Sequence, residues 1–469
     1  MTLRTTPAFG WRFVTPLYTG SVLNPVNSSI IATALVPIAD AMHTSVGQAS
    51  VLVSSLYLAC VVAQPTAGKL SEVFGPRKVF VAGILLVLAG GIAGGVGQNL
   101  ATLVVARVLI GVGTSAGYPS AMVLIRGRAA AAGLGEPPGS VLGGLAIAGM
   151  ATLAIGPPVG GLLVGLSGWR AAFLVNVPVT LAALAMALRW LPRDRAEPRR
   201  PAREVVSQVD VAGIAGFGGA MTALLVFLMS LPDPNWPALA VAVVLAIALV
   251  WWELRAATPF FDVRGLAANG ALTRTYVRTG LTQLGMYTVL YGITQWLEAG
   301  PGYSAETAGL ILVPMGALSA LVSGPISRRN LVRGPLVTAA LCMLVATVGM
   351  LFLAGTGPVI LAVGVTLLFG IVGGTSAVGN QTALYAQAPA DAIGTASGLF
   401  RTFSYTGSIA SATITGLIFH ATVTDAGLHT IAAILVVVGA VVLLMSVLDP
   451  ALRKAPRQPP RKAPSKEPA

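Results

Sequence analysis

The sequence contains very little charge, since only 10% of its 469 residues are Asp, Glu, Lys or Arg. Soluble domains carry about a quarter charged residues, so this shortage excludes an ordinary soluble protein. The hydrophobic fraction is 55%, and apolar segments recur along almost the whole chain. Such a surface needs lipid around it. We therefore predict that the membrane domain makes up nearly the entire protein.

Cysteine and histidine are also scarce. Cys60 and Cys342 lie in separate apolar segments without motif partners, which argues against a disulfide framework and a metal site. His43, His420 and His429 map near the outer face, either as exposed loop residues or as a proton port. No Ser/His/Asp, HExxH, Walker or cysteine-cluster arrangement occurs, so we predict no enzyme, no metal and no cofactor.

Basic residues exceed acidic ones and give a net charge of +13. They form short runs between apolar segments rather than a stripe with interleaved aromatics, which argues against a nucleic-acid partner. Lys and Arg are retained on the cytoplasmic side of a membrane. If both termini are inside, all of the 29 Lys and Arg residues except Arg107 and Arg170 map near that side. We therefore predict a multi-pass protein of the bacterial inner membrane with cytoplasmic termini.

Apolar segments of roughly 20 residues, the length that spans a bilayer, occur about fourteen times. The first, Phe13–Ala39, follows two arginines but has no convincing cleavage site, so we expect a retained helix rather than a signal peptide. The other segments are Val46–Ala67, Val79–Val96, Ala101–Ile125, Val141–Leu166, Ala171–Trp190, Val209–Leu231, Ala238–Trp252, Tyr276–Leu297, Thr307–Ser323, Leu336–Leu353, Val359–Gln381, Thr395–Phe419 and Thr430–Leu448.

The order of these segments predicts an all-α integral membrane protein with five regions. They are a six-helix bundle at 1–190, a cytoplasmic linker at 191–207, two inserted helices at 208–256, a second six-helix bundle at 257–450 and a disordered basic tail at 451–469. A loose repeat supports two related halves, because Gly68 to Gly75 resembles Gly324 to Gly334. Many secondary transporters consist of such halves around a central site.

The loop after the second segment, GKLSEVFGPRK at residues 68–78, has a specific glycine spacing. Gly68 and Gly75 permit a tight turn between helices. The Glu72 carboxylate near the basic residues of this loop, Arg77 among them, can latch one conformation through charge-assisted bonds. The alternative interpretation is a plain basic loop on the cytoplasmic side.

Two further segments contain unusual residues for a membrane helix. Arg107 lies inside the fourth segment, where a charge costs about 2.5 to 3.5 kcal/mol, so it faces a cavity or a partner, or it snorkels to the outer interface. The fifth segment contains GPPVGG at residues 156–161. Gly156, Gly160 and Gly161 allow close helix approach, and Pro157 kinks the helix. This suits a pivot between halves, or simple close packing.

These motifs, together with GWRAAFLVNVP at 168–178 and PFFDVR at 259–264, resemble the fourteen-helix drug:proton antiporter family of the major facilitator superfamily. The resemblance covers most of residues 20–450. It implies the major facilitator fold, with two six-helix bundles plus two extra central helices, and 14 transmembrane helices in all. Members usually carry an acidic residue near the position of Asn27. The motifs identify the family and not the cargo.

A polar and aromatic stripe runs along the ninth segment. Gln283, Tyr287, Tyr291 and Gln295 recur at four-residue steps, and Glu298 follows three residues later. Such a stripe in an apolar helix predicts contact with water or substrate, or a packing seam with hydrogen bonds between helices. We extend the expected substrate-binding chamber to polar residues of other segments, namely Asn24, Asn27, Tyr57, Gln64, Tyr118, Asn380 and Gln381.

These observations predict a monomeric secondary transporter that exports a small amphipathic compound in exchange for protons. All 16 acidic residues map to loops or helix ends, so we expect neutral or anionic cargo at least as much as cationic cargo. Proton coupling then uses a peripheral group, with Glu298 ahead of Asp40. The alternatives are an importer or exporter of a specific metabolite on the same fold, and a nontransporting receptor.

Overall fold

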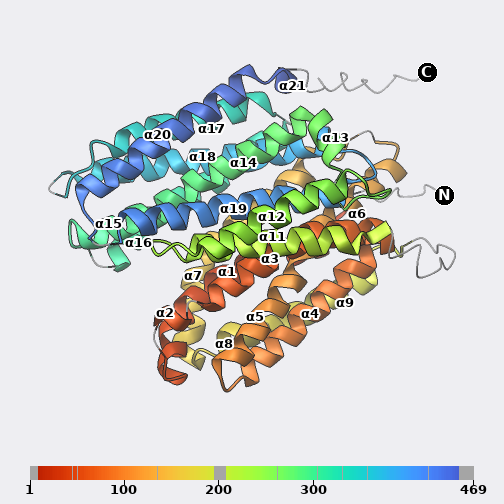
Figure 1. Cartoon of the computed structure of the whole chain (residues 1–469), viewed down its shortest axis with the longest axis horizontal. Helices are drawn as coiled ribbons and strands as arrows, with labels where there is room; N and C mark the ends of the chain where they lie inside the picture. The colour runs from red at the N-terminus through yellow and green to blue at the C-terminus, as the bar shows by residue number, and fades with distance from the viewer. Residues whose placement is uncertain are drawn as a thin grey trace, which may run out of the picture.

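All regular structure in the described residues is helical in this computed structural model. The structure describes residues 9–44, 46–49, 51–134, 136–194, 208–260, 262–303, 305–329, 331–355, 357–420 and 422–453. Long helices run side by side through the molecule, and both described chain ends lie at the same end of it (Figure 1). We call this the near end, and we call the opposite end, which holds α2, α8 and α15, the far end.

The first half of the chain forms one group of long helices. Asn99 begins one of them by accepting a hydrogen bond of 2.9 Å from the amide of Thr102, which replaces a bond that the first turn lacks. The helices are α1 (Trp11–Ala41), α2 (Val46–Ala49), α3 (Val51–Phe74), α4 (Pro76–Val96), α5 (Leu100–Ser115), α6 (Gly117–Ala131), α7 (Gly139–Ser167), α8 (Ala171–Leu174) and α9 (Asn176–Trp190). The short α2 and α8 sit at the far end (Figure 1).

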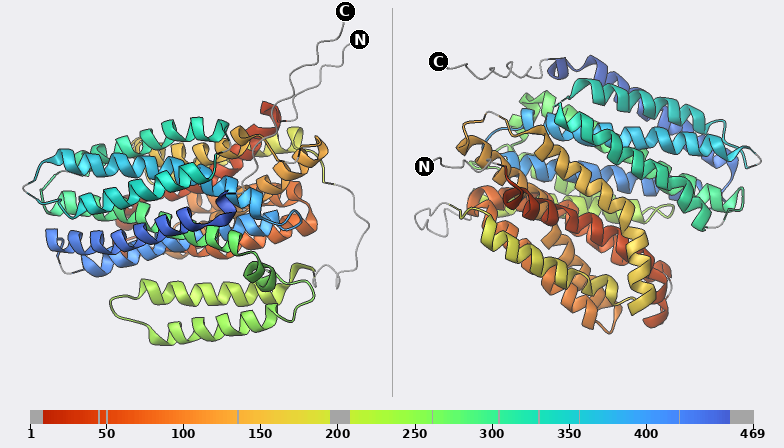
Figure 2. Two further views of the ribbon diagram at one scale, coloured as in Figure 1. Left: turned by 90° about the horizontal axis from the view of Figure 1, so that it is seen from above. Right: turned by 180° about the vertical axis from the view of Figure 1, so that it is seen from behind.

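The inserted pair consists of α11 (Val211–Met229) and α12 (Trp236–Glu253). It packs along one side of the two halves and is set apart from them in the left view of Figure 2. Asp210 fixes its near end, because the carboxylate accepts hydrogen bonds from the Gly213 amide at 3.0 Å, the Trp252 indole at 2.8 Å and the Phe260 amide at 2.8 Å. Most of the predicted linker, residues 195–207, lies outside the described residues.

The second half of the chain forms the other group. Its helices are α13 (Val263–Ala268), α14 (Gly270–Thr288), the π-helix η1 (Val289–Ile293), α15 (Thr294–Ala299), α16 (Ala305–Arg328), α17 (Arg333–Met350), α18 (Val359–Gln387), α19 (Ile393–Ile418), α20 (Asp425–Leu448) and α21 (Pro450–Arg453). The predicted basic tail lies outside the described residues from position 454 onward.

Ten described helices are long and apolar enough to cross a membrane, and the bent α1 makes an eleventh. The predicted count of fourteen is not confirmed by this measure and stays a prediction. Two of the remaining long helices, α14 and α19, are rich in Thr, Ser, Tyr and Arg, which lowers their hydropathy. In the described part of α7, the apolar stretch is Gly139–Gly149, which is too short to be counted as a membrane span.

The buried clusters show how the halves meet. Near the near end, one cluster mixes both halves and includes Tyr118 and Ile125 with Tyr276 and Phe400. Toward the far end, the buried members of the clusters belong to one half only, with one group around Leu103 and another around Trp296, among others. The halves are therefore packed together at the near end and separate toward the far end.

One predicted boundary is wrong in a way that matters for function. Residues 68–74 belong to α3 rather than to a loop, so Gly68 makes no turn. Its missing side chain allows close approach instead, because a Cβ atom there would collide with the carbonyl oxygen of Gly394 in α19. Gly75 does form the turn, with φ of 100°, a conformation that favours glycine.

Candidate functional site

A central cavity of about 110 Å³ lies between the two halves. Its walls come from α1, α3 and α7 on one side and from α14, α18 and α19 on the other. Amide, hydroxyl and aromatic side chains dominate the lining: Asn24, Ser28, Tyr57, Thr279, Thr282, Gln283, Tyr287, Ser376, Asn380, Gln381, Phe400, Arg401, Ser404, Tyr405 and Ser408. This lining offers ring faces for stacking and adaptable hydrogen-bond partners.

Arg401 is the one charged side chain among the described lining residues. It lies roughly 12 Å along α19 from Ile393, at 1.5 Å per residue. Its guanidinium carbon is 4.1 Å from the ring centroid of Tyr118, a cation–π contact worth about 0.5 to 2 kcal/mol. The buried Nε of Arg401 has no hydrogen-bond partner in the described part of the chain. The cavity thus presents a cation and, in its described lining, no carboxylate.

The prediction that all Lys and Arg except Arg107 and Arg170 lie near the cytoplasmic boundary is wrong for Arg401. This residue sits inside the predicted segment Thr395–Phe419, and it faces the cavity. The signal was present in the sequence, because a charge inside a membrane helix normally faces a cavity or a partner. The argument used for Arg107 applies equally to Arg401.

Asn24 joins three helices at the wall of the cavity. Its side-chain nitrogen donates to Cys60 Sγ and to Thr114 Oγ1, both at 3.0 Å. Its oxygen accepts a hydrogen bond of 2.5 Å from the hydroxyl of Tyr405 in the other half. The ring of Tyr57, a predicted site residue, lies 5.8 Å from the ring of Tyr405. Tyr405 itself was missed by the sequence analysis.

Asn27 does not line the central cavity. It forms a reciprocal amide pair with Asn176, in which the two hydrogen bonds measure 2.7 and 2.9 Å. Arg107, with 1% of its surface exposed, donates to the carbonyl oxygens of Leu52 at 2.9 Å and Asn27 at 3.2 Å. Of the alternatives stated for Arg107, this placement favours buried partners over snorkelling to the outer interface. The substrate-binding role predicted for Asn27 has no support from this placement.

The stripe on the ninth segment does not keep one face. Gln283 and Tyr287 line the central cavity, but Tyr291 lines a second cavity beside α11. The reason is the π-helix Val289–Ile293, whose wider turn rotates everything beyond it. Gln295 and Glu298 are consequently exposed at the far end. The four-residue steps predicted a continuous α-helix, and this was wrong.

The remaining predicted chamber residues divide into two groups. Asn380 and Gln381 line the cavity. Gln64 and Tyr118 are buried but are not in its lining. The backbone of Gln64 lies against Gly398, where α3 and α19 approach closely, and the ring of Tyr118 contacts the Arg401 guanidinium.

Three hydrogen bonds join α3 to α19, two at the near end and one at the level of the cavity. The Glu72 carboxylate accepts hydrogen bonds from the Thr395 amide at 2.7 Å and from its hydroxyl at 2.9 Å. The hydroxyl of Thr402 donates to the carbonyl oxygen of Val61 at 2.9 Å. Glu72 therefore connects the two halves through the start of α19, and its predicted role as a latch stays a prediction. Arg77 and Gly75 contact Asp194 and Leu188 within the first half.

The predicted pivot in α7 is described in part. A Cβ atom at Gly160 would lie 2.7 Å from Thr33 Oγ1 and 3.0 Å from the Cα of Ile30, so this glycine allows α7 to pack closely on α1. Gly156 is buried, and Gly161 has open space around it. The side chain of Pro157 lies outside the described part of the molecule. Asp40, the second predicted coupling residue, is exposed at the far end of α1.

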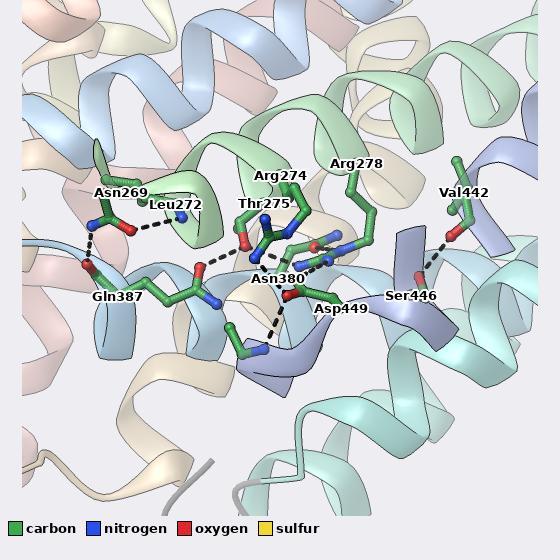
Figure 3. Close-up of polar contacts among 11 residues, drawn as sticks. Asn269, Leu272, Arg274, Thr275, Arg278, Asn380, Gln387, Val442, Ser446 and Asp449 are labelled. Carbon is green, nitrogen blue, oxygen red and sulfur yellow. Dashed lines mark hydrogen bonds and ion pairs between the residues drawn. The ribbon is translucent and has the colours of Figure 1, made fainter. Parts of the chain in front are cut away.

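A buried polar network runs from the cavity to the end of α20 (Figure 3). Arg278 donates through Nε to Asn380 Oδ1 at 2.8 Å and through Nη2 to Thr275 at 2.9 Å. Its Nη1 lies 3.7 Å from Asp449 Oδ2, and Arg274 pairs with the other oxygen of Asp449 at 2.8 Å. The sequence analysis missed this network because Asp449 and Arg278 are 171 positions apart and meet only in the fold.

Comparisons with known proteins agree with this architecture. The family model described as Major Facilitator Superfamily matches residues 17–412. The uncharacterized MFS-type transporter YwoD of Bacillus subtilis is 34% identical over 94% of this chain and 97% of that protein. The tetracenomycin C resistance and export protein of Streptomyces glaucescens is 31% identical over 90% of this chain and 79% of that protein. The human organic anion transporter MFSD10 has 14% identity and a TM-score of 0.65, with 93% of this chain and 100% of that chain covered.

Proposed function

We propose, since the chain belongs to the Major Facilitator Superfamily, that it exports small amphipathic compounds that are neutral or anionic. The single observation that carries the proposal is the placement of Arg401 in a central cavity whose described lining contains no carboxylate. A buried cationic cargo without a counter-charge is strongly disfavoured in such a site. An anionic cargo instead gains a charge-assisted hydrogen bond to Arg401.

The aromatic part of the lining supports an amphipathic cargo. Tyr57, Tyr287, Tyr405 and Phe400 provide ring faces, and the amides of Asn380 and Gln283 provide both donors and acceptors. Relatives with export or resistance in their names, including the tetracenomycin C resistance and export protein and the multidrug resistance protein Stp of Mycobacterium tuberculosis, support efflux. Stp shares 29% identity over 62% of this chain.

Transport proceeds by alternating access in this proposal. The two six-helix bundles, 1–190 and 257–450, act as the moving halves, and the inserted pair at 208–256 accompanies them. Both bundles are packed together at the near end through Glu72 and Thr395. With the predicted cytoplasmic termini, this is the state closed to the cytoplasm. Opening the near end then requires that the bonds between α3 and α19 break.

Export is driven by proton entry in this proposal. The described cavity lining has no carboxylate, so the proton binds elsewhere. Glu298 remains the first candidate and Asp40 the second, because both are exposed at the far end, where protons enter. Replacing Glu298 by Gln tests this assignment, since transport driven by a pH gradient should fall while transport driven by cargo exchange should remain.

The test of the cargo class uses proteoliposomes with an imposed pH gradient and three fluorophores of similar size with negative, zero and positive charge. Wild type should transport the anion and the neutral compound. Arg401→Gln should slow the anion about tenfold, the equivalent of about 1.4 kcal/mol, and Arg401→Lys should retain part of the rate. Arg170→Gln is the matched control, because Arg170 is exposed and stacks on Trp169. Wild-type transport restricted to permanent cations would overturn the proposal.

A further inference from the structure

A second cavity, of about 360 Å³, lies behind α11 toward the far end. Its walls are the first turns of α3, the last turns of α11 and the second half of α19, with Tyr291 from η1. At this level the inserted pair thus covers a gap between the two halves. The left view of Figure 2 shows the pair lying alongside the rest of the molecule.

The second cavity adjoins the central one. Tyr57 and Ser408 belong to the lining of both cavities. The rings of Tyr287, in the central cavity, and Tyr291, in the second cavity, have centroids 5.6 Å apart. The π-helix Val289–Ile293 produces this arrangement, because it turns Tyr291 away from the central cavity. A lateral route from the central cavity to the space behind α11 would therefore pass the side chains that the two cavities share, Tyr57 and Ser408.

Polarity changes along this path. The hydroxyl groups of Tyr57, Tyr291 and Ser408, together with those of Ser54 and Thr413, lie on the walls formed by α3, η1 and α19. The opposite wall is apolar and consists of Leu225, Leu228 and Met229 of α11 and of Leu231 just after it. An amphipathic molecule matches this gradient, with its polar head toward Arg401 and its apolar chain toward α11.

The inserted pair is held more firmly at one end than at the other. At the near end, the Asp210 carboxylate accepts hydrogen bonds from nitrogens of Gly213, Trp252 and Phe260. Gly218 lets α11 approach α3 closely, because a Cβ atom at this position would lie 3.0 Å from the side chain of Val62. At the far end, the second cavity separates α11 from α3 and α19. A helix anchored in this way can swing at its far end.

We propose that α11 is a lateral door and that amphipathic cargo with an apolar chain leaves the central cavity behind it, into the far leaflet of the membrane. The inference rests on the proposed function, because it assigns the exit route of the same cargo. It also gives the inserted pair a role, which is to shield the apolar chain from water while the polar head passes Arg401.

Gly416 allows this door to be tested by filling the cavity. It lines the second cavity in α19, and a Cβ atom built there meets no atom within 4 Å. Gly309 in α16 is the matched control, since it is exposed and equally open but lines neither cavity. Neither glycine has a positive φ, so both positions accept a larger residue in the helix.

The experiment measures export from proteoliposomes of two probes, a hydroxycoumarin carboxylate without a chain and the same fluorophore with a dodecyl chain. Gly416→Trp should slow the dodecyl probe about tenfold and leave the short probe within about twofold of wild type, and Gly309→Trp should leave both within about twofold. If Gly416→Trp does not yield a monodisperse carrier, Gly416→Leu gives the same comparison with a smaller side chain.

The outcomes separate the door from the proposed function. Equal slowing of both probes by a stably folded Gly416→Trp variant, or no slowing of the dodecyl probe, would overturn the lateral door. If wild type exports neither probe, the proposed function fails instead. If wild type exports both and only the dodecyl probe is slowed, the inserted pair guards the route of the apolar chain.

Discussion

The hydroxyl of Tyr405 donates a hydrogen bond of 2.5 Å to Asn24 Oδ1, and this bond connects the two halves directly across the wall of the central cavity. The side-chain nitrogen of Asn24 also donates to Cys60 and Thr114 in its own half, so its amide is oriented independently of Tyr405. Any motion that separates α1 from α19 breaks this bond. The bond therefore stabilises the arrangement in which the halves are packed together at the near end.

Replacing Tyr405 by Phe should shift the carrier away from the closed arrangement while the ring contact with Tyr57 remains. A net hydrogen bond is worth about 0.5 to 1.5 kcal/mol, so the ratio of closed to open molecules should fall by up to about tenfold. Distances between spin labels on the two halves would measure this ratio. A Tyr405→Phe variant with the wild-type distance distribution would show that the bond has no part in closure.

The latch at the near end gives a second prediction. Glu72→Gln keeps an acceptor for Thr395 but removes the negative charge at the start of α19, where such a charge is stabilising. We expect the near end to open more often, at a cost to closure of about 1 to 3 kcal/mol. Labelling of a cysteine placed on the α3 side of this contact would report the opening. Glu136→Gln, at an exposed position, should leave the labelling rate unchanged.

A third prediction separates two polar residues that the sequence alone made equivalent. Gln283 lines the cavity, whereas Asn27 is sealed in its pair with Asn176 beside Arg107. Gln283→Glu should therefore introduce transport of cationic amphiphiles and reduce transport of anionic ones. Asn27→Asp should not, because its carboxylate would lie next to Arg107 and outside the cavity. Transport assays with fluorophores of similar size and opposite charge measure both variants. A gain of cation export in Asn27→Asp but not in Gln283→Glu would contradict this assignment.

Much of the fold could be predicted from the sequence because membrane helices are long apolar segments, and the family was recognisable from short motifs such as GPPVGG at 156–161. The site was predicted less well. Asn24, Tyr57, Gln283, Tyr287, Asn380 and Gln381 line the cavity as expected. Asn27 has the same chemistry but satisfies it in its pair with Asn176, and Gln64 is buried where α3 packs against α19. Polarity in a membrane helix indicates a partner without saying whether that partner is protein or cargo.

Two further differences have local physical causes. The π-helix at Val289–Ile293 rotated the second half of the polar stripe, and nothing in a four-residue periodicity reveals a single wider turn. Arg278 and Asp449 meet only because α14 and α20 are neighbours in space. The location of Arg401 was within reach of the sequence, since the charge interrupts an otherwise uncharged helix.

The buried pair of Arg278 and Asp449 leads to the last prediction. The two residues are 1% and 2% exposed, so removing one partner leaves the other as a buried charge. Asp449→Leu should destabilise the carrier by about 3 to 5 kcal/mol, because Arg278 is left as a buried charge. Arg274 also loses its partner, but this side chain is partly open to solvent and contributes little to the loss.

The double variant Asp449→Leu with Arg278→Leu should recover most of that loss, because apolar residues replace both charges. Unfolding by titration with a denaturing detergent measures each variant, and the double-mutant cycle isolates the interaction between the two residues. Because Arg278 also donates to Asn380 at the cavity wall, the double variant should be stable and yet altered in cargo affinity. Losses that simply add would show that Arg278 and Asp449 act independently, and the path from the cavity to the end of α20 would then carry no coupling.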